Sequence, residues 1–162
     1  MYIYGGKSML TKFSVENYKS FNKKITMDLT KAHDYDFNRE AIKNGVIKNA
    51  VIFGQNGSGK SNFSLALFDI VVTLTDKNCD GLQLDPNSFL NFNSSKKSAT
   101  FSYEFMFKDK IVQYEYKKSS PQALTFEKLK INGDVVFSCD FIQKKFSSFE
   151  LSQIGLESFT YD

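Results

Sequence analysis

The stretch AVIFGQNGSGKS, residues 50–61, is the most informative part of this chain. It contains the pattern G-x-x-x-x-G-K-[S/T], whose fixed positions here are Gly54, Gly59, Lys60 and Ser61. Average amino-acid usage produces such a match on the order of once in a few hundred chains of this length. The apolar run at residues 50–53 predicts a short strand buried on both faces of a sheet. Apolar residues at helical spacing follow, so the sequence predicts a strand, a phosphate-binding loop and a helix in that order.

The residue types in this loop suit a nucleoside triphosphate with Mg²⁺. Glycines permit backbone angles that are closed to other residues, and they bring amide groups near the phosphates. Successive N–H groups from Asn56 to Ser61 form an anion-binding nest at the positive end of the following helix. We expect Lys60 to reach the β- and γ-phosphates and the Ser61 hydroxyl to be the Mg²⁺ ligand. The predicted ATP-binding residues are Gly54, Gln55, Asn56, Gly57, Ser58, Gly59, Lys60 and Ser61.

Alternating apolar residues predict a β-hairpin ahead of this loop. Residues 10–18 place Phe13 and Val15 on one side of a half-buried strand. Residues 23–29 repeat the pattern after a turn-rich link, so the two strands are expected to pair. Residues 30–48 are polar and irregular, and for them we expect a loop with one helical turn near residues 39–43.

A helix is predicted at residues 61–75, directly after the glycines. Its apolar stripe consists of Phe63, Leu67, Ile70, Val71 and Leu74. Residues 76–98 read as a loop with a turn at residues 85–88 and an apolar anchor at residues 89–90.

The rest of the chain predicts an antiparallel meander over residues 99–152. Aromatic residues alternate with small or polar ones from Phe101 to Phe107 and again from Val112 to Tyr116. The dipeptide Asn132-Gly133 lies between two apolar stretches, which is a strong hairpin signal.

Composition is that of one globular domain. The chain has 162 residues, is 41% hydrophobic and carries a net charge of +3, which is too small to indicate nucleic acid by itself. Cys79, Cys139 and His33 have no zinc-ligand spacing, so two reduced thiols are expected. The sequence contains no apolar run as long as a membrane span and no signal-peptide pattern, so we expect no membrane association and a cytoplasmic location.

The acidic residue that P-loop ATPases use for hydrolysis is not evident. The best candidate, Asp140 at the end of residues 135–140, follows a broken apolar run, and we interpret this segment as a surface strand end. Residues 151–155 have only a faint similarity to the signature of ATP-binding cassettes. The sequence lacks the N-K-x-D motif that would indicate a GTPase. No nucleophile motif accompanies His33, which we expect to be a solvated surface residue.

Two segments together resemble a known family. They are FSVENYKSF at residues 13–21 and VIFGQNGSGKSN at residues 51–62. Both resemble the ATPase heads of SMC and RecF proteins, and more closely the cassette-like AAA-family ATPases of OLD-like and abortive-infection proteins. The resemblance covers nearly the whole chain, with the phosphate loop as its most specific part.

The resemblance implies a fold, further site residues and partners. The fold would be an α/β P-loop NTPase with α+β character, residues 1–162 forming the N-terminal lobe of an ABC-type head. Lys19, Ser20 and Asn62 would lie near the nucleotide. The whole protein would be an ATP-driven head-to-head homodimer in DNA repair or antiphage defence, with DNA as a possible partner. The second lobe of such heads carries the Walker B strand and signature, so hydrolysis would need a missing C-terminal lobe or a second ATPase chain.

Other interpretations of the same residues stay open. One is a self-contained, regulatory nucleotide-binding module without turnover. Another is a small kinase, which the scarcity of arginine disfavours, because Arg39 is the only Arg available to clamp a transferred phosphate. Residues 1–8 are interpreted as a translated leader ahead of a start at Met9, the alternative being an added edge strand.

Overall fold

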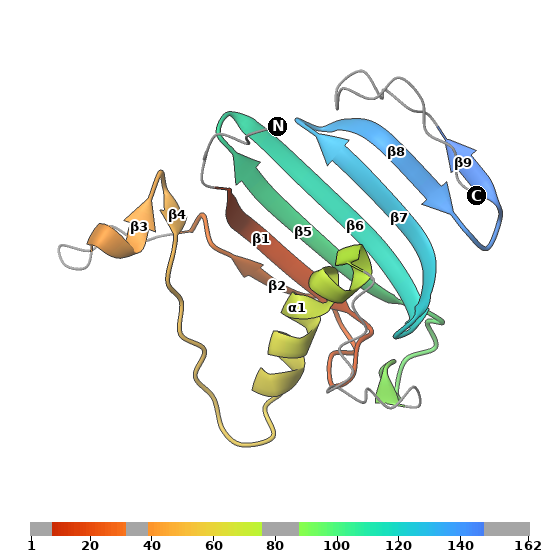
Figure 1. Cartoon of the computed structure of the whole chain (residues 1–162). Helices are drawn as coiled ribbons and strands as arrows, with labels where there is room; N and C mark the ends of the chain where they lie inside the picture. Colours follow the sequence, from red (N-terminus) through yellow and green to blue (C-terminus); the bar gives the residue numbers. More distant parts are fainter. Residues whose placement is uncertain (1–7, 32–38, 76–87, 148–162) are drawn as a thin grey trace.

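The computed structural model of the chain describes residues 8–31, 39–75 and 88–147. Within these ranges the protein is of mixed α+β class, with one α-helix and a seven-stranded antiparallel sheet (Figure 1). The strand order is β2-β1-β5-β6-β7-β8-β9. The strands of this sheet are β1 (Met9–Glu16), β2 (Ile25–Asp28), β5 (Ala99–Phe107), β6 (Lys110–Ser120), β7 (Ala123–Ile131), β8 (Asp134–Asp140) and β9 (Lys145–Ser147).

The predicted N-terminal hairpin is confirmed. Strands β1 and β2 pair antiparallel, with Val15 opposite Ile25 and Lys12 opposite Asp28. In the connecting turn, the backbone N–H groups of Tyr18 and Phe21 each donate to the other residue's carbonyl, at 3.1 and 2.8 Å. This turn is the segment that contains Lys19 and Ser20.

The predicted meander is also confirmed where the structure describes it. Strands β5 to β8 follow one another antiparallel, and Asn132-Gly133 forms the β7–β8 turn with φ of 52° and 93°. Both positive angles suit this dipeptide, because Asn tolerates the left-handed region and Gly has no Cβ to clash. Strand β9 continues the sheet, while residues 148–152 of the predicted subregion lie outside the described residues.

The predicted helix after the glycines is α1 (Lys60–Thr75), and it packs on one face of the sheet (Figure 1). Its Phe63 ring meets the Phe13 ring of β1 edge-on, with centroids 5.5 Å apart. The core beneath it is largely aromatic, since alternate residues of β1, β5 and β6 face the helix. Its buried members are Phe13, Val15, Tyr18, Ala66, Phe89, Ala99, Phe101, Tyr103, Tyr114 and Tyr116.

The apolar stripe predicted for α1 is only partly buried. Phe63, Leu67 and Ile70 pack against the core as expected. Val71 and Leu74 are instead 49% and 62% exposed, because they lie on the side of the helix turned away from the sheet. The helix therefore carries apolar side chains on two faces and buries one of them.

The prediction of a buried strand at residues 50–53 is wrong. This segment forms no strand and is exposed, with Val51 at 75% and Phe53 at 88%. A strand buried on both faces needs a parallel neighbour and a covering layer on each side. The described strands are antiparallel, and none of them pairs with this segment.

The predicted loop at residues 30–48 contains a small hairpin that was missed. After the 3-10 helix η1 (Arg39–Ala41), which lies within the predicted helical turn, β3 (Ile42–Lys43) pairs with β4 (Val46–Ile47). Asn44-Gly45 makes their turn with φ of 52° and 73°, and this dipeptide was a readable hairpin signal. The Ile47 N–H donates to the Leu29 carbonyl at 2.9 Å, which ties the hairpin to the end of β2.

Candidate phosphate-binding site

Two of the three glycines in the loop adopt backbone angles that favour glycine, as the sequence predicts. Gly57 and Gly59 have φ of 80° and 94°, whereas Gly54 does not have a positive φ. A Cβ at Gly59 would lie 2.9 Å from the Ser20 Oγ and 3.2 Å from the Phe21 ring, so glycine is needed there for space as well. A Cβ at Gly54 would lie 2.7 Å from the Ser58 Oγ. The loop is thus compact, and at Gly59 it touches the β1–β2 turn.

The start of α1 directs amide groups toward the loop. The Phe63 N–H donates to the Gly59 carbonyl at 2.8 Å. The amides of Lys60, Ser61 and Asn62 precede this first helical bond, so the helix itself gives them no acceptor. No acidic side chain lies in the first turn to neutralise the positive end of the helix dipole. This end of α1 is chemically suited to an anion.

Lys60 lies folded over the loop. Its Nζ donates to the carbonyls of Gly54 and Gln55, both at 2.7 Å. The cation is therefore among the loop residues, where its partners are neutral oxygens. Phosphate oxygens form stronger, charge-assisted hydrogen bonds with an ammonium group than carbonyls do.

The structure brings Ser20 to the loop, whereas the Lys19 ammonium group points elsewhere. The Asn62 Nδ2 donates to the Ser20 Oγ at 3.0 Å, which connects the first turn of α1 to the β1–β2 turn. The Lys19 Nζ donates to the Ser88 carbonyl at 3.4 Å, and the Lys19 backbone N–H donates to the Phe89 carbonyl at 3.0 Å. Residues 54–62 and Ser20 therefore form one candidate site. The Lys19 side chain lies outside this site and is directed to the Ser88 carbonyl.

Three residues that position this turn were missed at the level of sequence. Asn17 is fully buried with φ of 56°, and its Nδ2 donates to the carbonyls of Lys96 and Ser98, each at 2.9 Å. The Asn91 Nδ2 donates to the Lys19 carbonyl at 2.6 Å, and the Phe21 ring packs beside Gly59. Nothing local in the sequence identifies the Asn17 and Asn91 partners, because these contacts join segments more than 70 residues apart.

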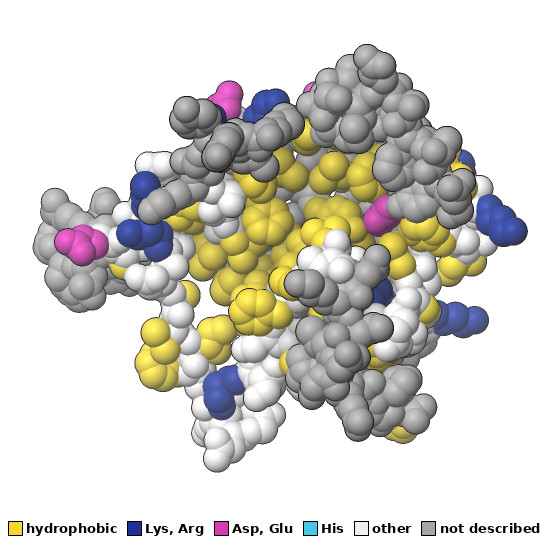
Figure 2. All heavy atoms as spheres, viewed as in Figure 1, with side chains coloured by type: hydrophobic (Ala, Val, Ile, Leu, Met, Phe, Trp, Pro, Cys, Tyr) yellow, Lys and Arg dark blue, Asp and Glu magenta, His cyan; other side chains and the backbone are white. Residues whose placement is uncertain are grey.

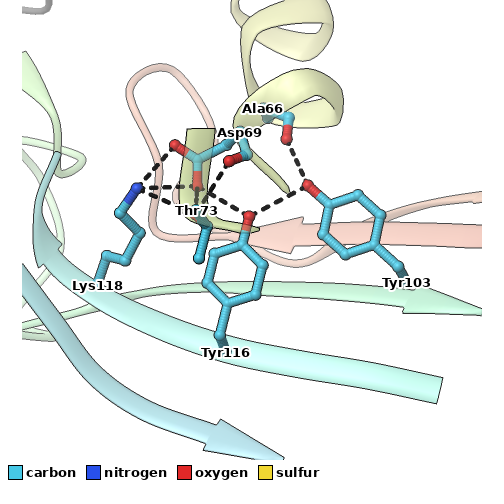
Figure 3. A network of polar contacts seen from close by, with 6 residues as sticks. All are labelled: Ala66, Asp69, Thr73, Tyr103, Tyr116 and Lys118. Carbon is cyan, nitrogen blue, oxygen red and sulfur yellow. Dashed lines mark hydrogen bonds and ion pairs between the residues drawn. The ribbon is translucent and has the colours of Figure 1, made fainter. Parts of the chain in front are cut away.

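A buried polar cluster lies between α1 and the sheet (Figure 3). The Asp69 carboxylate of α1 accepts hydrogen bonds from Lys118 and Tyr116 of β6, and the Tyr103 hydroxyl of β5 donates to the Ala66 carbonyl. Burial, with the Asp69 charge as a further contribution, raises the pKa of the Tyr103 and Tyr116 hydroxyls above the ordinary range. An acidic residue inside the apolar sequence of residues 65–72 was the available signal for this cluster.

Asp140 is the last residue of β8, and its carboxylate is engaged by the turn that follows the strand. Its Oδ1 accepts the N–H groups of Ile142 and Gln143 at 3.0 and 2.9 Å. The segment is strand β8, as predicted, although its Val136 and Cys139 are fully buried rather than at the surface. Burial raises the pKa of the Cys139 thiol. Among the described residues, no group of three His, Cys, Asp or Glu side chains could hold a metal ion.

Several sequence-level predictions fall outside the described ranges. These concern His33, Cys79, residues 151–155, the turn at residues 85–87 and the candidate leader up to residue 7.

No protein-family model matches the chain, and no curated protein matches it. In the part of the chain that the structure describes, no helix has the length and apolar character needed to cross a membrane.

Proposed function

We propose that this chain binds ATP with Mg²⁺ through residues 54–62. The observation that carries the proposal is a glycine loop with positive φ at Gly57 and Gly59 that leads directly into the 16-residue helix α1, with Lys60 folded over it. Loop amides, an uncompensated helix N-terminus and a lysine cation are then concentrated at one point.

The backbone amides and the side chains of the loop have distinct roles in this proposal. The amides of Asn56 to Ser61 donate to phosphate oxygens, and Lys60 exchanges its carbonyl partners for the β- and γ-phosphates. The Ser61 hydroxyl is one ligand of Mg²⁺, which would neutralise phosphate charge. Ser20 supports Asn62 from the facing turn. Lys19, held by Ser88 and Phe89, acts on the turn rather than on the phosphates.

We further propose that residues 1–162 are the N-terminal lobe of a cytoplasmic, cassette-like ATPase of the type found in DNA repair and antiphage defence. The support is the order of features along the chain: an opening strand, the turn with Ser20, the phosphate loop, one helix and an antiparallel sheet. The Asp140 carboxylate accepts the amides of the turn after β8, so hydrolysis in this proposal depends on residues supplied by another lobe or chain.

The exposed apolar surface supports a partner. Residues 51–53 are exposed, and on α1 so are Phe68 at 65%, Val71 and Leu74. Figure 2 shows hydrophobic side chains gathered on the face between the β3–β4 hairpin and α1. A hollow of about 730 Å³ lies in the same region, lined by Leu10, Met27, Leu29, Ile52 and Leu67 among others. A helix that is apolar on both faces is typical of one buried in a larger assembly. We propose that a second lobe or chain covers this face, within a head-to-head homodimer.

The experiment that tests nucleotide binding is calorimetry of the whole chain with Mg²⁺ and ATP. Lys60→Ala deletes the cation over the loop and should remove most of the affinity. Lys97→Ala is the matched control, because Lys97 is an exposed lysine on the loop before β5, and it should bind as the parent does. Equal affinity of the Lys60→Ala variant and the parent would refute the assignment of this loop.

A self-contained regulatory module without turnover is the second candidate, favoured because the Asp140 carboxylate is engaged by the amides of the turn after β8. Phosphate release by the chain alone tests the module. A rate that depends on Lys60 would exclude the module, whereas binding without any Lys60-dependent rate fits both functions, because the cassette-like lobe also needs another lobe or chain for hydrolysis.

A further inference from the structure

The buried cluster beneath α1 has a composition that packing alone does not require. The Asp69 and Lys118 side chains are only 3% and 4% exposed, and the Lys118 Nζ lies 3.1 Å from both carboxylate oxygens. The Tyr116 hydroxyl donates to Asp69 Oδ2 at 2.8 Å, and the Thr73 Oγ1 lies 3.2 Å from the same oxygen. A full ion pair is therefore enclosed between a helix and a sheet.

A second set of contacts extends the cluster along the helix. The Tyr103 hydroxyl donates to the Ala66 carbonyl at 2.8 Å and lies 3.4 Å from the Tyr116 hydroxyl. Lys118 also donates to the Thr73 Oγ1 at 3.3 Å. The sheet thus holds Ala66, Asp69 and Thr73, which lie on one side of α1 at helical spacing. Figure 3 shows all three turned toward the side chains of β5 and β6.

Apolar contacts would not fix the placement of this helix. Burial of apolar surface is non-directional, and α1 offers the sheet a second apolar side through Phe68, Val71 and Leu74. Hydrogen bonds, by contrast, weaken steeply with a change of angle or distance. A buried ion pair adds little net stability compared with apolar residues of similar volume, so a role in specifying one arrangement is the more direct explanation.

We propose that Asp69, Lys118, Tyr103 and Tyr116 are positioning residues for the phosphate loop. They fix the rotation and the axial position of α1 on the sheet, and this holds the loop at the helix N-terminus against the Ser20 turn. The proposal rests on the proposed nucleotide site. It gives the antiparallel sheet a function in that site, although none of these four side chains belongs to the loop.

The geometry shows why the site depends on this placement. Asp69 lies nine residues after Lys60 on one continuous helix, roughly 13 Å at about 1.5 Å per residue. A rotation of the helix at Asp69 is therefore transmitted to Gly59 and Asn62. There the Asn62–Ser20 hydrogen bond is 3.0 Å long and a Cβ at Gly59 would lie 3.2 Å from Phe21, so little displacement is tolerated.

The main test replaces the ion pair with apolar residues of similar size, as Asp69→Leu combined with Lys118→Met. The variant should fold and melt near the parent temperature, because such exchanges are often neutral or stabilising. Its Kd for Mg-ATP should rise about tenfold, the effect expected if α1 occupies the binding-competent placement about one-tenth of the time. A folded variant with the parent Kd would overturn the proposal.

A milder pair of variants keeps the test decisive if the double variant does not fold. Tyr116→Phe removes the hydroxyl that donates to Asp69, whereas Tyr114→Phe removes a buried hydroxyl two positions away on the same strand that donates to Glu127. Tyr116→Phe should weaken nucleotide binding at least about threefold, through the competent fraction of the helix, while Tyr114→Phe leaves it unchanged. Equal effects of the two changes would contradict the proposal.

A measurement without nucleotide separates this proposal from the proposed function. Amide chemical shifts of Ser20 and of residues 59–62 in the free protein should change in Tyr116→Phe and stay at the parent values in Tyr114→Phe. If the parent fails to bind Mg-ATP yet these shifts change as described, the nucleotide assignment fails and the positional role of the cluster stands. Unchanged shifts in Tyr116→Phe would overturn the positional role.

Discussion

Replacing Gly59 with alanine tests the contact between the glycine-rich loop and the β1–β2 turn, and Gly57→Ala provides its control. Both glycines have positive φ, at 94° and 80°, so both substitutions carry backbone strain of about 1–2 kcal/mol. Their surroundings differ. A Cβ at Gly57 meets nothing within 4 Å, whereas one at Gly59 meets the Ser20 Oγ at 2.9 Å and the Phe21 ring at 3.2 Å.

The expected difference between the two variants follows from this contrast. Overpacking costs typically about 1–3 kcal/mol, and at Gly59 it adds to the backbone strain that both variants share. Rotation of the Ser20 side chain about χ1 would move its Oγ and relieve part of the clash, but it would break the hydrogen bond that this Oγ accepts from Asn62. For a domain of this size, each kcal/mol shifts the melting temperature by about 2–4 °C. Gly59→Ala should therefore melt about 2–12 °C below Gly57→Ala.

Thermal unfolding followed by circular dichroism measures this difference. Ser20→Ala combined with Gly59→Ala should recover part of the lost melting temperature, because the closest contact is then removed. Equal melting temperatures for Gly57→Ala and Gly59→Ala would refute the packing of the loop against the turn. Ser20 would then lose its place in the candidate site.

Two further predictions concern the support of the site. Asn17→Asp should lower the free energy of unfolding by about 2–5 kcal/mol in urea titrations near neutral pH. The reason is that a buried carboxylate would face the carbonyls of Lys96 and Ser98 without a proton to donate. An effect no larger than that of the exposed change Asn93→Asp would contradict the assigned hydrogen bonds. The raised pKa values of Tyr103 and Tyr116 predict a contribution to the free energy of unfolding that is fully present below the ordinary tyrosine pKa of about 10. This contribution is lost as the pH rises above that value, by up to about 1.4 kcal/mol per pH unit for each group. Urea unfolding between pH 8 and about 11 checks this, and Tyr103→Phe with Tyr116→Phe should flatten the decline, whereas an unchanged decline would place the titrating groups elsewhere.

Local patterns in the sequence predicted much of this fold. Alternation of apolar residues identified β1, β2 and the strands of the meander, because side chains on successive strand positions face opposite sides. Asn132-Gly133 identified a hairpin, since its backbone angles depend on those two residues alone. The glycine-rich loop and the helix after it were equally local features.

The tertiary structure decided what depends on neighbours distant in the sequence. The apolar run at residues 50–53 predicted a buried strand, but pairing needs a partner strand, and none of the described strands provides one. Which side of α1 is buried depended likewise on the sheet, so Val71 and Leu74 lie outward despite their spacing.

The candidate site also has one part that the sequence determined and another that depended on the tertiary structure. The sequence by itself determined the conformation of the loop at Gly57 and Gly59, because positive φ angles depend on the glycines themselves. Only the tertiary structure placed Ser20 against Asn62 and Asp69 against Lys118, pairs that lie 42 and 49 positions apart. The physical reason is that loop conformation is a property of adjacent residues. The partner of a buried polar group, by contrast, is set by how the helix docks on the sheet.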